Sequence, residues 1–147
     1  AVAEHIDTKS IITFFESELG RIALGGENTV WREWPFTFAL PAVARASSPW
    51  STARPVPSEV EGMAVPLSTS DEMIIVQGII DMLIQTPHGL VVIDFKTDNV
   101  TAEQVAERAK SYRRQLELYG RAASAILKEK LLAKWLYFLT LGCAVEV

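Results

Sequence analysis

The spacing of hydrophobic residues near the start of the chain predicts an amphipathic helix over residues 8–19. Its apolar side chains would share one broad helical face: Ile11, Ile12, Phe14, Phe15 and Leu19. Asp7 or Thr8 can cap the start of this helix, and Gly20 is expected to end it. We therefore expect the first regular element to be a helix with one buried face.

Three later segments have the composition of β-strands. Residues 29–40 are rich in aromatic and β-branched side chains, and Pro35 among them favours an edge strand or a bulge. Residues 73–85 and 89–96 are apolar runs on either side of the short turn "TPHG". We expect these two runs to pair as a hairpin.

A second helical pattern covers about residues 102–129, where Thr101 and Gln104 match a capping box at the start. Its apolar positions recur every three or four residues: Val105, Ala109, Tyr112, Leu116, Tyr119 and Ala123. Two short strands, "KWLYFLTL" and "AVEV", follow around Gly142. This order of elements predicts an α/β protein of the α+β kind, with a mixed sheet and flanking helices.

Residues 41–72 interrupt the regular pattern. They contain five of the seven prolines, among many Ser, Ala and Thr residues. This composition predicts a long surface loop or insertion with little regular structure. We expect residues 1–147 to form a single domain that carries this insertion, since a chain of this length can bury a real core.

Composition and charge exclude several classes of protein. No apolar stretch approaches the roughly 18–20 residues that cross a bilayer, and the first residues lack the pattern of a signal peptide. The single cysteine, Cys143, excludes an intrachain disulfide and suits a reducing, cytoplasmic location. The net charge is −4, so contact with nucleic acid would have to be local or depend mainly on other domains.

Two acidic residues interrupt the apolar strands of the predicted hairpin. If residues 86–89 form its loop, Gln85 faces Leu90 and Asp81 faces Asp94. Directly opposed residues point to one face, with Cβ atoms about 4.5–5.5 Å apart. The two-residue period of a strand adds Lys96 to that face. The hairpin therefore brings two carboxylates and a lysine together, provided that the register holds.

Two ionised carboxylates at this separation repel by roughly 3 kcal/mol at an effective dielectric constant near 20. Lys96 can neutralise part of this charge, and a divalent cation such as Mg²⁺ or Mn²⁺ can neutralise more. A lysine beside such a cation can orient or deprotonate an attacking water molecule. The set favours metal-assisted phosphodiester hydrolysis, although Asp and Lys two residues apart at a strand end are often simply solvated.

Three motifs in order resemble those of RecB-type nucleases in the PD-(D/E)XK superfamily: G-x-x-D in "VQGIIDMLI", D-x-K in "GLVVIDFKTD" and Q-x-x-x-Y in "YRRQLELYGRA". The segments "WREWPFTF" and "LYFLTLGCAVEV" look like parts of the C-terminal nuclease domains of the AddA family of helicase–nuclease subunits. The resemblance covers nearly the whole chain except residues 41–72. It implies a restriction-endonuclease-like core.

The resemblance implies a role for each matching residue. Asp81 and Asp94 would bind the metal, with the backbone carbonyl of Phe95 as a further ligand. Lys96 would be the catalytic lysine. Four other residues would contact DNA or support the site: Gln115, Tyr119, Glu33 and Gly78.

Structural roles for these four residues stay open as alternatives. Tyr119 also lies on the apolar stripe, Gln115 can be a buried amide, and Gly78 can mark a bulge. Glu33 can pair with an arginine. Arg113 and Arg114 can contact phosphates, but a solvated helix face explains them as well.

The chain departs from the family in one respect. It has no Gly-Thr-x-x-His motif, whose histidine completes the metal site of the family, and no phosphate-binding loop of a helicase motor. We therefore expect a fragment that begins after the first helix of the nuclease fold, with ATP used only by a helicase domain absent from this chain.

The resemblance implies a Mg²⁺- or Mn²⁺-dependent DNA exonuclease domain of an ATP-dependent helicase–nuclease for double-strand-break repair and recombination. Its partners would be single-stranded DNA, helicase domains of the same parent chain and an AddB-like subunit, with no membrane. Two alternatives stay open: a catalytically silent module for DNA guidance or subunit docking, and another enzyme of the superfamily, such as a restriction-type endonuclease or a junction resolvase.

Overall fold

The structure is a computed structural model that describes residues 8–41 and 73–147. Its elements run in the order α1 (Thr8–Glu16), α2 (Glu18–Ala23), β1 (Thr29–Pro41), β2 (Met73–Thr86), β3 (Gly89–Lys96), α3 (Val105–Leu127), β4 (Leu131–Phe138) and β5 (Cys143–Glu146). The predicted order of helices and strands is therefore confirmed, except that two helices, α1 and α2, stand where one was predicted. No helix among the described residues combines the length and the apolar character that crossing a bilayer requires.

The chain divides into two units, one made of Ala1–Phe38 with Gln77–Val147 and one made of Ala39–Val76. The site described below lies in the first unit. The predicted loop at 41–72 falls, apart from Pro41, outside the described residues, as do Asp7 and the other residues before Thr8. A single domain with an insertion at this position therefore stays a prediction.

The five strands form one sheet in the order β1-β2-β3-β4-β5. β3 pairs with β2 and β4 pairs with β5 in antiparallel fashion, whereas β3 and β4 are parallel. The predicted mixed sheet is confirmed, because it contains both parallel and antiparallel pairs. The parallel β3–β4 pair needs a crossover connection, and α3 supplies it. β1 is an edge strand, which is where the missing N–H of Pro35 can be tolerated.

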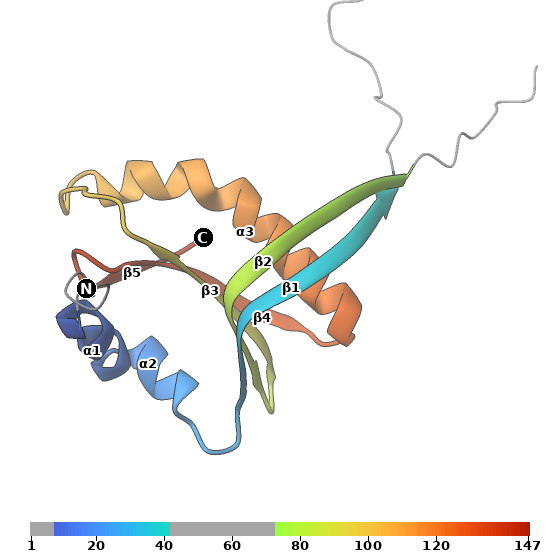
Figure 1. Ribbon diagram of the computed structural model, residues 1–147, viewed down its shortest axis with the longest axis horizontal. Helices are drawn as coiled ribbons and strands as arrows, with labels where there is room; N and C mark the ends of the chain where they lie inside the picture. The colour runs from blue at the N-terminus through green and yellow to red at the C-terminus, as the bar shows by residue number, and fades with distance from the viewer. Residues whose placement is uncertain (1–7, 42–72) are drawn as a thin grey trace, which may run out of the picture. The chain divides into compact units, whose positions relative to one another are not determined.

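Helices cover both faces of the central strands (Figure 1). α1 and α2 pack on one face, where Phe14 and Leu19 meet Ile84 and Ile93 of the sheet. α3 packs on the other face, where Leu116 meets Leu136 and other buried residues of the α3 stripe and the sheet. Because alternate residues of a strand point to opposite faces, Asp94 lies on the α3 side while its neighbour Ile93 lies on the α1 side.

The predicted end of the first helix at Gly20 is wrong. The helix breaks at Ser17, whose hydroxyl donates a 2.6 Å hydrogen bond to the carbonyl of Phe14 and accepts one from the N–H of Gly20. Ser17 thereby becomes the N-cap of α2, because its side chain competes with the helical hydrogen bonds. Gly20 instead allows close packing, since a Cβ there would lie 2.2 Å from the Phe14 carbonyl oxygen.

The predicted start of the long helix at residue 102 is also wrong, because α3 begins at Val105. Only half of the capping box forms. The Gln104 side chain accepts a 3.1 Å hydrogen bond from the N–H of Thr101, while Gln104, at the N-cap position, makes no side-chain cap. The apolar stripe is confirmed, since Val105, Ala109 and Leu116 are buried.

Candidate functional site

The hairpin register that the sequence predicts is confirmed from Gln85↔Leu90 to Met82↔Ile93. The expected four-residue loop is wrong, because Thr86 and Gly89 also pair and leave a shorter turn between them. The ladder ends at Met82↔Ile93, one step before Asp81 and Asp94. Beyond that point a side chain accepts the next hydrogen bond from β3: Asp81 Oδ2 accepts a 2.8 Å hydrogen bond from the N–H of Phe95. Asp81 is thus held beside β3 by the backbone of the strand that carries the other two residues of the set.

Asp94 is the only buried charged residue in the described part of the chain, at 3% exposure. Its Oδ2 lies 2.6 Å from Lys96 Nζ. The ammonium of Lys96 is therefore the charge partner of this buried oxygen. Burial raises the pKa of Asp94, Lys96 offsets part of that rise, and the charge of Asp81 adds to it.

Lys96 is the point where β3 meets α3. Its ammonium donates a 3.4 Å hydrogen bond to Gln115 Oε1 and lies 3.9 Å from the centre of the Tyr112 ring. Gln115 Nε2 in turn donates a 2.7 Å hydrogen bond to the hydroxyl of Tyr119, one helical turn further on. The structure therefore brings the glutamine and tyrosine of the Q-x-x-x-Y motif to the lysine of the D-x-K motif.

Gly78 and Tyr119 meet on the β1 side of this group. The Tyr119 ring packs edge-on against Phe36 of β1, with ring centres 5.6 Å apart. A Cβ on Gly78 would lie 2.8 Å from the Phe36 ring and 3.2 Å from the Tyr119 ring. Gly78 thus permits a close approach of two aromatic rings, and Tyr119 combines core packing with a polar contact to Gln115.

Glu33 is not brought to the carboxylates. It is exposed on β1, and neither a hydrogen bond nor an ion pair joins its side chain to another residue of 8–41 or 73–147. Its φ of 48° is unusual for a residue other than glycine. The arginine partner considered from the sequence is therefore not present among these residues. Arg113 and Arg114 are both exposed on α3.

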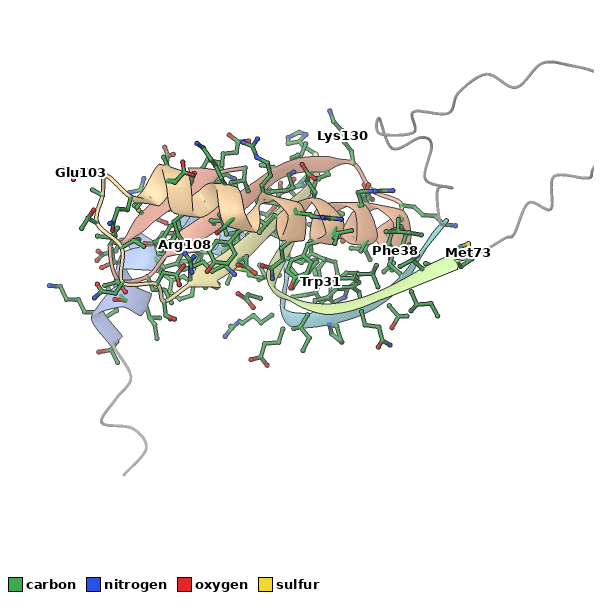
Figure 2. All side chains as sticks on the ribbon, turned by 90° about the horizontal axis from the view of Figure 1, so that it is seen from above. Trp31, Phe38, Met73, Glu103, Arg108 and Lys130 are labelled. Carbon is green, nitrogen blue, oxygen red and sulfur yellow. The ribbon has the colours of Figure 1, made fainter. Side chains whose placement is uncertain are left out.

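The sequence reading missed a polar cluster next to Lys96. Arg108, near the start of α3 in Figure 2, contacts Asp98 through two nitrogens at 3.0 and 3.4 Å. The hydroxyl of Tyr112 donates a 2.8 Å hydrogen bond to Asp98 and accepts one of 3.0 Å from Arg108. One signal was available, because Tyr112 and Gln115 are three residues apart and so share a helix face.

The contacts among Asp98, Arg108 and Tyr112 shift the pKa values of Asp98 and Tyr112. Hydrogen bonds, first from Arg108 and then from Tyr112, hold the pKa of Asp98 below its ordinary value. The hydrogen bond to Asp98 raises the pKa of Tyr112. Asp98 is therefore an anion at neutral pH, and Tyr112 stays protonated.

The residues at the end of β3 fit a divalent cation with oxygen ligands. Asp94 contributes a buried carboxylate, and Asp81 is fixed beside it by the N–H of Phe95. The N–H and C=O of one strand residue point to the same side, so the Phe95 carbonyl faces the same side as its N–H, which meets Asp81. No group of three or more His, Cys, Asp or Glu side chains assembles in the described ranges, but Mg²⁺ commonly uses only one or two carboxylates.

Comparison with known proteins places these motifs in context. A family model described as the PD-(D/E)XK nuclease superfamily matches residues 13–142. Curated relatives, each named as the A subunit of an ATP-dependent helicase/nuclease, are similar along nearly the whole chain. The protein of Desulforudis audaxviator is 36% identical over 97% of this chain, that of Moorella thermoacetica is 33% identical over 99%, and that of Ligilactobacillus salivarius is 34% identical over 98%. The chain spans 10%, 9% and 10% of their respective lengths.

Proposed function

Because the chain belongs to the PD-(D/E)XK nuclease superfamily, we propose that it is a DNA nuclease domain that hydrolyses phosphodiester bonds with Mg²⁺ or Mn²⁺. The family membership predicted from the motifs and the α+β fold class predicted from the order of elements are confirmed. The observation that carries the proposal is the convergence of Asp94, Asp81 and Lys96 at the end of β3, with Lys96 Nζ 2.6 Å from Asp94.

Each residue has a chemical task in this proposal. Asp81, Asp94 and the carbonyl of Phe95 would hold the cation. A bound cation would supply positive charge to the phosphate and would lower the pKa of a bound water molecule. As an ammonium, Lys96 would orient the attacking water, and Gln115 supports this role by holding the ammonium close to the carboxylates. Only the neutral amine, formed when Lys96 gives a proton to solvent, would take the proton of that water.

The remaining candidates have supporting tasks. Tyr119 would steady Gln115 or line the path of the DNA, and Gly78 would let the Phe36 and Tyr119 rings pack closely. Glu33 is proposed to act on the DNA side of the domain, because it is exposed and has no partner among the described residues. The net charge of −4 means that other domains would supply much of the affinity for DNA.

We also propose that the chain is the nuclease domain of a helicase–nuclease subunit. The relatives that match it carry that name and are about ten times longer than the matching region. In this proposal helicase domains of the parent chain use ATP and feed single-stranded DNA to the site, an AddB-like subunit is the partner, and the enzyme processes broken DNA ends in the cytoplasm.

Alanine substitutions in the complete subunit test the nuclease proposal. We expect Asp94→Ala and Lys96→Ala to abolish Mg²⁺-dependent cutting while ATP-dependent unwinding persists. Lys9→Ala is a matched control, because Lys9 is an exposed lysine on α1, which packs on the opposite face of the sheet from α3. Cutting at the original rate by the Lys96 variant would contradict the proposal.

Calorimetry separates a nuclease from a catalytically silent module. We expect the complete subunit to bind Mg²⁺ or Mn²⁺, and we expect the binding heat to disappear in Asp94→Ala. Failure of the original protein to bind either cation, together with an absence of cutting, would favour the silent module for DNA guidance or subunit docking.

A further inference from the structure

The side chain of Tyr112 lies against the ammonium of Lys96. Nζ is 3.9 Å from the centre of the ring, well within the range of about 6 Å over which an aromatic face attracts a cation. Lys96 retains only 15% side-chain exposure, so little water competes with this contact. The ring therefore forms one wall of the small space that holds the ammonium.

Two other groups contact the ammonium. The carboxylate of Asp94 lies 2.6 Å away, and Gln115 Oε1 accepts a hydrogen bond at 3.4 Å. Carboxylate and amide oxygens attract Nζ through their negative charge, whereas Tyr112 offers the face of an aromatic ring. The ring is thus the one aromatic contact of the ammonium among the described residues.

The Tyr112 ring is itself fixed at its far edge. Its hydroxyl donates to Asp98 at 2.8 Å and accepts from Arg108 at 3.0 Å, while Asp98 and Arg108 form a two-point ion pair. Asp98 lies two residues after Lys96, and Arg108 lies one helical turn before Tyr112. The Asp98–Arg108 pair therefore connects the segment that follows β3 to the first turn of α3.

We infer that Tyr112 is a positioning residue for Lys96, with its ring holding the ammonium beside Asp94 and with the Asp98–Arg108 pair holding the ring. This inference rests on the proposed function, in which Lys96 acts on the attacking water. Tyr112 itself has no proposed contact with the cation or with the reacting phosphate. It acts by keeping Nζ at one place at the end of β3.

Two substitutions in the complete subunit separate the ring from the hydroxyl. Tyr112→Leu keeps apolar volume but removes the aromatic face, and we expect kcat for cutting to fall by about 10- to 100-fold because the lysine loses its position. KM should stay within about twofold, since the cation ligands and the DNA contacts remain. Tyr112→Phe keeps the ring and should retain at least about a third of kcat, because only the hydroxyl contacts are lost.

Metal binding and rescue by the phenylalanine variant distinguish positioning from a merely structural role. Calorimetric Mg²⁺ binding to Tyr112→Leu should match that of the original protein, and the phenylalanine variant should rescue cutting. A leucine variant that cuts with unchanged kcat would overturn the inference. If Tyr112→Leu does not fold, Tyr112→Met decides in the same way, because an unbranched methionine fits irregular spaces.

The lysine variant keeps this test apart from the proposed function. If Lys96→Ala is inactive and Tyr112→Leu keeps its kcat, the positioning role fails while the nuclease proposal stands. If Lys96→Ala itself cuts at the original rate, the proposed function fails and the inference fails with it.

Discussion

Asp81 accepts a hydrogen bond from the backbone N–H of Phe95 at 2.8 Å, directly beyond the last paired residues of β2 and β3. A side chain thus replaces the next backbone hydrogen bond of the ladder. The contact satisfies a part-buried N–H and at the same time fixes one carboxylate of the candidate site. Structure and proposed chemistry therefore depend on the same side chain, that of Asp81.

Substitutions of Asp81 should separate these two tasks. Asp81→Ala leaves the Phe95 N–H without a partner, so we expect the free energy of unfolding to fall by about 1–3 kcal/mol. Asp81→Asn keeps an oxygen acceptor and should lose less than half as much, although both variants should lose cation binding. Denaturant unfolding measures the difference, and equal stability of the two variants would contradict the proposed role of this hydrogen bond.

The burial of Asp94 predicts a pH dependence of stability. Because its pKa is raised above the ordinary value of 3.8, the fold favours the protonated carboxyl. Its stabilising contribution is present below pH 3.8 and is lost as pH rises through the higher pKa of the folded protein. Without added cation, the stability of the original protein relative to Asp94→Asn should therefore decrease over that window.

Denaturant unfolding of both proteins between pH 3 and about 7 measures this dependence. The comparison cancels the titration of the other carboxyl groups, which the two proteins share. A stability difference that stays constant across the window, or that grows in favour of the original protein as pH rises, would show that burial does not raise the pKa of Asp94.

Gly78 predicts a packing effect that reaches the site. In Gly78→Ala the new Cβ would lie 2.8 Å from the ring of Phe36, which is buried and packs against Tyr119. We expect a loss of about 1–3 kcal/mol in the free energy of unfolding, and slower cutting because Tyr119 moves away from Gln115.

Gly26→Ala is the matched control for this substitution, because nothing lies within 4 Å of a Cβ at Gly26. Its unfolding midpoint and its cutting rate should both stay near those of the original protein. Equal effects of the two glycine substitutions would refute the packing argument, since they would then reflect the general change in backbone freedom.

Replacing tyrosine by phenylalanine should affect the free energy of unfolding differently at positions 137 and 112. The Tyr137 side chain is fully buried, and its hydroxyl has no hydrogen-bond partner among the described residues. Tyr137→Phe should therefore raise the free energy of unfolding by about 1 kcal/mol, since an unsatisfied buried hydroxyl is lost. Tyr112→Phe removes two hydrogen bonds and should not raise it. Calorimetric unfolding of both variants checks the signs.

Much of the fold was predictable because its signals are local. Apolar runs on either side of a short turn identified β2 and β3, and the fixed sum of paired positions predicted their register. The apolar stripe likewise predicted the buried face of α3. The ends of elements were less predictable. The first helix ends before Gly20, because the Ser17 hydroxyl binds the Phe14 carbonyl and Ser17 becomes the N-cap of α2.

By itself, the sequence determined that Asp94 and Lys96 share a face of β3 and that Gln115 and Tyr119 share a face of a helix. These relations follow from the periods of strand and helix, which involve only neighbouring residues. The tertiary structure alone decided that Lys96 reaches Gln115 and the Tyr112 ring, that Arg108 pairs with Asp98, and that Asp94 is buried. Such contacts depend on how α3 is placed and rotated over the sheet, and packing between layers sets that placement.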